Sequence, residues 1–284
     1  MRGMHMAARS PPYILKLQVT RRDKLSLLGA SLFVLALVAP NSAKAEICLV
    51  SNQGSTPATD YGNSSALACG NDTKANGTFA LAIGGTATGL FAQAMGAAAN
   101  ANGASALAIG HDAGAAGIHA TTIGNDTHAT GDYATALGAF RTNANGNQAT
   151  AVGNYAYATG DFASAFGTDS NASGNTATAI GGYSSATGAS ATAVGRATAN
   201  GVSASAFGNG STASGSNATA VGVSSNAGGN YATAIGSSSN ANGSQATAIG
   251  ATSQAIGICN SHRNQCLDVR QLWHVDGLSS QFHG

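Results

Sequence analysis

The chain has 284 residues, a formal net charge of +1 and a charged fraction of only 8%. In ordinary globular domains, about a quarter of all residues are charged. Glycine accounts for 39 residues, and the large apolar residues are few and regularly spaced, which excludes a thick globular core. Seven of the twelve basic residues fall within 1–45, so the remainder is mildly acidic and has no basic stripe for nucleic acid.

Residues 21–45 have the pattern of an export signal. Basic residues at positions 21, 22 and 24 precede a largely apolar stretch over 25–38, and the small-x-small pattern at 43–45 is typical of a cleavage site. The apolar stretch is too short for a comfortable membrane span. We therefore predict that residues 1–45 are a signal peptide with an N-terminal extension, cleaved after Ala45 and used for Sec-type export.

From 62 to 257 the chain repeats a unit of the form Ala-x-Ala-apolar-Gly, whose glycine is here called the main glycine. This unit recurs fourteen times, and ten of the thirteen spacings are identical to that from Gly96 to Gly110. In the last thirteen units a second glycine precedes the main one at a constant distance, as Gly103 precedes Gly110. All later length variation falls after the main glycine, which predicts defined strands with one tolerant turn. The main glycines are Gly70, Gly84, Gly96, Gly110, Gly124, Gly138, Gly153, Gly167, Gly181, Gly195, Gly208, Gly222, Gly236 and Gly250.

The columns of the repeat predict two short strands per unit. Ala stands four residues before every main glycine and, except at Thr122, two residues before it, so apolar positions alternate with period two. Ala also stands two residues before each second glycine, which predicts the second strand. Glycines at both ends suit turns that need a positive φ. The residue before the main glycine is always apolar: Cys69, Ile83, Met95, Ile109, Ile123, Leu137, Val152, Phe166, Ile180, Val194, Phe207, Val221, Ile235 and Ile249.

Two strands and two turns in each fourteen-residue repeat make one coil of a parallel β-solenoid. Coils of this kind stack, and we expect stacking to bury the apolar column as a continuous ladder while the alanine columns permit close backbone approach. A single roll this thin buries little, and apolar columns fall on both faces of the first strand. We therefore expect an oligomer whose chains share a core.

The repeat resembles the head repeat of YadA-like trimeric autotransporter adhesins, the collagen-binding head domain. The likeness is carried by the pattern ATAIG…SxAxG, as in ATAIGSSSNANGSQATAIG at 232–250, and covers most of the chain. The resemblance implies a left-handed parallel β-roll assembled as a homotrimer. It also implies a cell-surface or outer-membrane location and attachment to a host cell or to extracellular-matrix proteins such as collagen.

The predicted organisation has four parts. Residues 1–45 form the export signal, 46–61 a lead-in, 62–257 the head repeats and 258–284 an atypical tail. The family's heads continue into a neck, a coiled-coil stalk and a barrel anchor, whereas the tail has no neck motif, no heptads and no alternating strands. A truncated or frameshifted reading frame and a free secreted head both stay open. As encoded, we expect export without an anchor or membrane span of its own, and hence a periplasmic or secreted product.

Side chains that suggest chemistry are present but do not form a recognisable site. His111, His119 and His128 lie near one another in sequence but at unequal repeat positions. Asp112, Asp126 and Asp132 lie outside the constant strand. We predict exposed loop residues here, and no catalytic, cofactor or metal site, no enzyme and no small-molecule substrate; no ligand-binding residue can be assigned.

The four cysteines, Cys48, Cys69, Cys259 and Cys266, leave their pairing open. Export permits disulfides, and Cys259 with Cys266 would close a short loop. Cys69 stands in the apolar column and is equally consistent with a small buried hydrophobe.

Two alternatives to adhesion stay open. The first is a purely structural surface sheath. The second is an ice-binding solenoid, because Thr fills the position three before the main glycine in eight units from Thr121 to Thr247. We rank ice binding lower, because Leu67, Leu81 and Leu107 occupy the same column and indicate a structural role.

Overall fold

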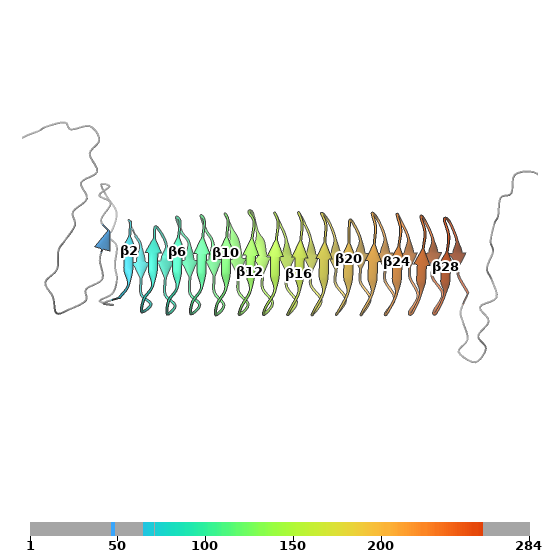
Figure 1. The fold of residues 1–284 in the computed structure, drawn as a ribbon, viewed down its shortest axis with the longest axis horizontal. Helices are drawn as coiled ribbons and strands as arrows, with labels where there is room; N and C mark the ends of the chain where they lie inside the picture. The colour runs from blue at the N-terminus through green and yellow to red at the C-terminus, as the bar shows by residue number, and fades with distance from the viewer. Residues whose placement is uncertain (1–46, 49–64, 71, 258–284) are drawn as a thin grey trace, which may run out of the picture. The chain divides into compact units, whose positions relative to one another are not determined.

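The computed structural model describes residues 47–48, 65–70 and 72–257 of the chain. These residues form 29 short strands and no helix. The strands belong to two parallel sheets, which confirms an all-β parallel solenoid (Figure 1). The predicted signal peptide, the tail and all of the lead-in except 47–48 lie outside the described residues.

Sheet 1 contains the strands that lead into the main glycines, preceded by β1. Neighbouring strands pair in register, so that Ala179 lies beside Ala193 and Ile180 beside Val194. The fifteen strands, in order, are β1 (Ile47–Cys48), β2 (Leu67–Cys69), β4 (Leu81–Ile83), β6 (Gln93–Met95), β8 (Leu107–Ile109), β10 (Thr121–Ile123), β12 (Thr135–Leu137), β14 (Thr150–Val152), β16 (Ser164–Phe166), β18 (Thr178–Ile180), β20 (Thr192–Val194), β22 (Ser205–Phe207), β24 (Thr219–Val221), β26 (Thr233–Ile235) and β28 (Thr247–Ile249).

Sheet 2 contains the strands that lead toward the second glycines. It is also parallel, and Ala172 lies beside Ala186 in its register. The fourteen strands are β3 (Lys74–Ala75), β5 (Thr86–Ala87), β7 (Asn100–Ala101), β9 (Gly114–Ala115), β11 (Thr127–Ala129), β13 (Thr142–Ala144), β15 (Tyr157–Ala158), β17 (Asn171–Ala172), β19 (Ser185–Ala186), β21 (Thr198–Ala199), β23 (Thr212–Ala213), β25 (Asn226–Ala227), β27 (Asn240–Ala241) and β29 (Gln254–Ala255).

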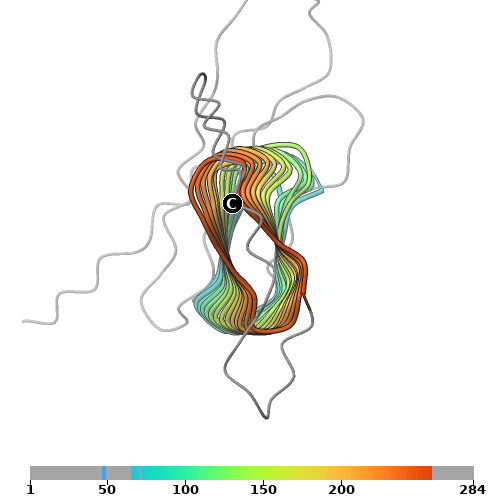
Figure 2. The same cartoon turned by 90° about the vertical axis from the view of Figure 1, so that its right-hand side faces the viewer.

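The core between the two sheets consists almost entirely of alanine. The end-on view shows the coils superposed, with the two sheets facing each other across a narrow interior (Figure 2). All the alanines of the repeat columns are buried. The remaining inward position, two residues before the alanine of each sheet 2 strand, holds Ala, Gly, Ser or Thr. The buried hydroxyls in this column are hydrogen-bonded; for example, Ser184 Oγ donates to the Gly181 carbonyl oxygen at 2.8 Å. Small side chains therefore let the two sheets approach closely.

The prediction that the residue before each main glycine is buried is wrong for a single chain. Ile180 is 42% exposed, whereas its neighbour Ala179 is fully buried. Alternation along the strand sends these two side chains to opposite faces, and the narrow interior accepts only the smaller one. The large apolar column therefore lies on the outer face of sheet 1.

The two glycine columns have different physical causes. Main glycines such as Gly110, with a φ of 133°, mostly adopt the positive φ that was predicted. The second glycines do not: a Cβ on Gly103 would overlap the carbonyl oxygen of Gly117 in the next coil. The positive φ instead falls two residues later, for example at Ser105. The second glycine is thus needed for close packing between coils.

Cys69 is disulfide-bonded in the structure. Backbone register places Cys48 of β1 directly opposite Cys69 of β2. Neighbouring parallel strands lie about 4.8 Å apart, which falls within the Cα separation that a disulfide spans. Of the two possibilities left open by the sequence, the structure therefore selects the bonded cysteine. Cys259 and Cys266 lie outside the described residues.

Candidate adhesive surfaces

The outer face of sheet 1 is an uncovered apolar ladder. Its members come from the residue before the main glycine, and eight of them are between 36% and 64% exposed. The neighbouring outward column, three before the main glycine, is mostly threonine and half-buried. Contiguous apolar surface of this length is characteristic of an interaction site. The eight residues are Ile83, Ile123, Phe166, Ile180, Phe207, Val221, Ile235 and Ile249.

The outer face of sheet 2 is polar instead. Its two outward columns hold mainly Asn, Thr and Ser, and some of these side chains are hydrogen-bonded from one coil to the next. Thr88 Oγ1 donates to Asn102 Oδ1 at 2.7 Å, and Thr187 Oγ1 donates to Asn200 Oδ1 at 2.9 Å. These residues give the roll a polar face opposite the apolar one.

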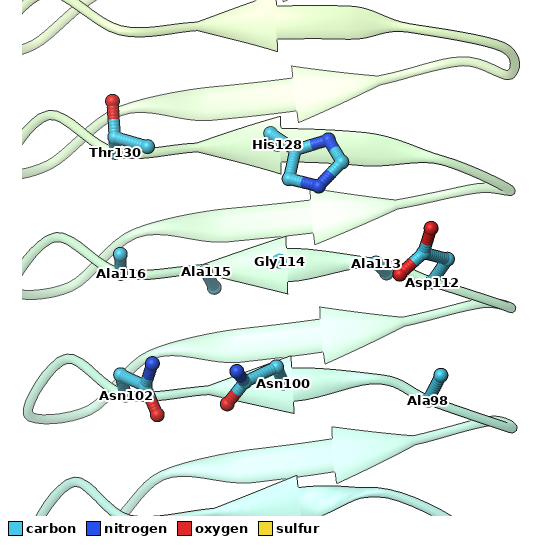
Figure 3. Close-up of a pocket in the computed structure, with 10 residues that line it drawn as sticks. All are labelled: Ala98, Asn100, Asn102, Asp112, Ala113, Gly114, Ala115, Ala116, His128 and Thr130. Carbon is cyan, nitrogen blue, oxygen red and sulfur yellow. The ribbon is translucent and has the colours of Figure 1, made fainter.

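The polar face is interrupted by a hollow of about 230 Å³ over β9. Figure 3 shows why: this coil presents outward only Gly114 of β9 and Ala116, which directly follows β9. The coils on either side carry longer side chains there, such as Asn100 of β7 and His128 of β11. The ring of His128 leans over Gly114, where an added Cβ would come within 2.8 Å of the imidazole Cδ2. The polar lining consists of Asn100, Asn102, Asp112, His128 and Thr130.

The turns that follow the second glycines carry a ridge of exposed rings. Each ring stands two residues after its glycine, so rings in adjacent coils meet face to face. Phe79 stacks on Phe91 with centroids 5.1 Å apart, and His119 stacks on Tyr133 at 5.0 Å. We call this column, from Phe79 to Tyr133, the aromatic ridge; it includes Ser105 between the two stacked pairs.

The opposite turns, after the main glycines, are the variable ones. All departures from the common repeat length occur here, as the sequence predicts. The shortened turn at Arg196 lets its guanidinium lie over the ring of Tyr183, 5.3 Å from the centroid. This cation–π contact stabilises the turn rather than forming a cavity.

The histidines and acids considered as metal ligands are distributed over different parts of the coil. His111, Asp112 and Asp126 lie at the variable turns, whereas His119 and Asp132 lie at the opposite turns. Within 65–70 and 72–257, no three His, Cys, Asp or Glu side chains converge as metal ligands.

His128 departs from the prediction that the histidines are loop residues. It belongs to β11 and is half-buried on the outer face of sheet 2, with Nδ1 3.7 Å from Asp126 Oδ1. Asp132 Oδ1 accepts a hydrogen bond from the Ile118 N–H at 2.8 Å and so joins adjacent turns. Repeat position alone could not reveal these contacts, because they depend on how the coils and turns are placed in space.

The fold and its surfaces define a class of protein, the β-solenoid that presents long repeated faces. The chain then matches the family description "YadA head domain repeat (2 copies)" over residues 63–87, 115–140, 144–170, 172–198, 199–225, 213–239 and 227–253. The chain belongs to the YadA head repeat family. This family consists of adhesin β-solenoids, which implies an adhesin-like function at the cell surface. No curated protein matches the chain.

Proposed function

We propose that this chain is the head of a homotrimeric adhesin that attaches to host cells or to extracellular-matrix proteins such as collagen. The observation that carries the proposal is the contrast between the two outer faces of the roll, one apolar and one polar. An apolar face fits assembly with identical chains, and a polar repeated face fits an extended ligand in water. Left-handed winding and the number three follow the family resemblance.

The apolar face supports the trimer. Ile180 and its equivalents in other coils form a ladder with no partner within the described part of one chain, and Ile180 is 42% exposed. Full burial of such a side chain is worth about 1.5–3 kcal/mol, and covering the exposed part contributes a corresponding share of this. Three copies meeting on these ladders would cover them all. Sedimentation of the purified protein tests this, and a stable monomer would contradict the trimer.

The polar face supports attachment to a repetitive partner. Asn, Thr and Ser recur along its two outward columns, so an elongated partner meets similar polar groups along the roll, and weak contacts add by multivalency. The described residues include no helix that is long and apolar enough to cross a membrane. We propose export through residues 1–45 and exposure of the head at the cell surface.

Retention of coated beads tests the adhesive function. The protein, immobilised on a surface, is expected to retain beads coated with collagen or other matrix proteins above a control of scrambled sequence. No retention across a panel of matrix proteins and host cells would contradict adhesion and favour a structural sheath. Freezing-point hysteresis without retention would favour ice binding through the threonine column of sheet 1.

A further inference from the structure

We propose that the gap in the aromatic ridge at Ser105 binds one ring of a neutral saccharide. This proposal rests on the adhesive function proposed above and names a ligand class for one place on the head. The ring would lie between the free faces of Phe91 and His119, and its hydroxyls would reach the polar hollow over β9.

Hydrogen bonds between coils hold the gap in register. The Ser105 N–H donates to the Leu90 carbonyl oxygen at 2.7 Å, and the His119 N–H donates to the Ala104 carbonyl oxygen at 2.8 Å. Phe91 is already stacked on Phe79, and His119 on Tyr133. Among the described residues no second ring stacks on the other face of Phe91 or of His119, and in both cases that face lies on the side of Ser105.

The width of the gap fits a single ring. Phe91 and His119 are two coils apart, and each coil advances about 4.8 Å, so their columns lie about 9.6 Å apart. The stacked pairs of the ridge have centroids 5.1 Å and 5.0 Å apart. A ring placed midway would thus have nearly the same spacing to Phe91 and to His119 as the ridge already uses.

Other positions in this column do not offer the same gap. Gln148 also stands between two aromatic neighbours, Tyr133 and Phe162, but its side chain is longer than that of serine. Ser203 is as small as Ser105, and the neighbouring coils carry Ser190 and Asn217 instead of rings. Ser105 therefore combines a small side chain with a ring on each side.

The neighbouring hollow provides the polar half of the site. Asn102 lies three residues before Ser105 in the same coil, at the end of the hollow where the strands run into these turns (Figure 3). The amide group of Asn102 contains both a donor and an acceptor, as sugar hydroxyls require, whereas Asp112 lies at the far end of the hollow (Figure 3). The lining contains no Lys or Arg, which favours a neutral sugar over a sulfated or acidic one.

A proline ring from a collagen-like peptide is the competing occupant. It fits the same width, but proline has no ring hydroxyl and the hydroxyproline of collagen has only one. A saccharide ring carries several hydroxyls and can therefore bond the polar groups while it fills the gap. The two occupants are distinguished by probing the same variants with neutral oligosaccharides and with a proline-rich triple-helical peptide.

The variant that tests the site is Ser105→Phe, which fills the gap with the ring that the column lacks. The backbone already holds phenylalanine at this φ in a neighbouring coil: φ is 58° at Phe91 and 56° at Ser105. The fold is therefore expected to tolerate the change. Ser203→Phe makes the same change in the same column, away from the ridge, and is the matched control.

Binding is measured on an array of neutral oligosaccharides ending in glucose, galactose or N-acetylglucosamine, with the full-length protein. We expect Ser105→Phe to weaken the best array ligand about tenfold or more through loss of two ring contacts, and Ser203→Phe to leave it unchanged. Phe91→Ala is expected to weaken it as well. Thermal unfolding of each variant reports whether the fold is intact.

Three outcomes would overturn the proposal: no array ligand binds, Ser105→Phe and Ser203→Phe bind alike, or only the proline-rich peptide responds to Ser105→Phe. Retention of matrix-coated beads is measured in parallel. Bead retention without saccharide binding would contradict this saccharide site but not the proposed adhesive function. If the unmodified head retains no matrix-coated beads, the proposed adhesive function itself is contradicted.

Discussion

The two outer faces of the roll are built on the same repeat, yet one carries apolar side chains and the other polar ones. Sheet 1 presents a half-exposed column of Ile, Val, Leu and Phe, and sheet 2 presents hydrogen-bonded Asn, Thr and Ser. Their inner faces are nearly identical, because both supply small residues to the same narrow core. The difference teaches that in this solenoid the core sets the coil, whereas the outer columns are free to vary and give each face its own chemistry.

The largest effect is expected at the shared inner face. Ala179→Asp places a carboxylate between the sheets, where Ala179 is fully buried among other alanines. The unpaired charge costs several kcal/mol, enough to unfold the coils around it. Circular dichroism and thermal unfolding measure the loss, and a variant that melts like the unmodified protein would show that the alanine column is not the core.

The next largest effect is expected on the apolar outer face. Ile180→Asp leaves each chain folded, because this side chain is exposed in the single chain, but in the proposed trimer the change would bring like charges together between the ladders. Sedimentation is expected to show dissociation into folded monomers. Ser185→Asp makes a similar change on the outer face of sheet 2 in the same coil, and a trimer that survives Ile180→Asp as well as Ser185→Asp would disprove the proposed interface.

The disulfide of Cys69 gives a smaller effect at the start of the apolar column. If the partner is Cys48, as the register indicates, the bond closes a loop of about 20 residues and is worth about 3 kcal/mol in the chain-entropy model. Cys69→Ser is expected to loosen the first coils while the middle of the roll keeps its stability. Peptide mapping without reduction identifies the partner, and hydrogen exchange locates the loosening. Equal exchange in both proteins would contradict a clamping role.

The smallest effect is expected on the polar face. Thr187→Val removes one exposed hydrogen bond to Asn200 and is expected to cost less than about 1 kcal/mol, with no change in assembly. A double-mutant cycle with Asn200→Ala measures the coupling. A loss comparable to that of Ala179→Asp would mean that the polar ladder, rather than the alanine core, holds the coils together.

The sequence identifies most of the fold. Constant glycine spacing predicted the coil length, and alternation of Ala with larger residues located both strands, because these signals are local. The cause of the second glycines was missed, since each is in close contact with the equivalent glycine of the next coil, as Gly103 is with Gly117. The hollow and the gap in the ridge were missed for the same reason. Gly114 and Ser105 look ordinary in sequence until register places longer side chains on either side.

By itself, the sequence determined the period, the strands and the alternation of two residue sets along each strand. Alternation states that Ala179 and Ile180 face opposite ways, but it cannot say which side is inside. The tertiary structure decided this, because two sheets joined by such short turns leave room only for alanine-sized side chains between them. It also stacked His119 on Tyr133 and placed Ser105 between the coils of Phe91 and His119, since only the stacking of coils brings residues from different units together.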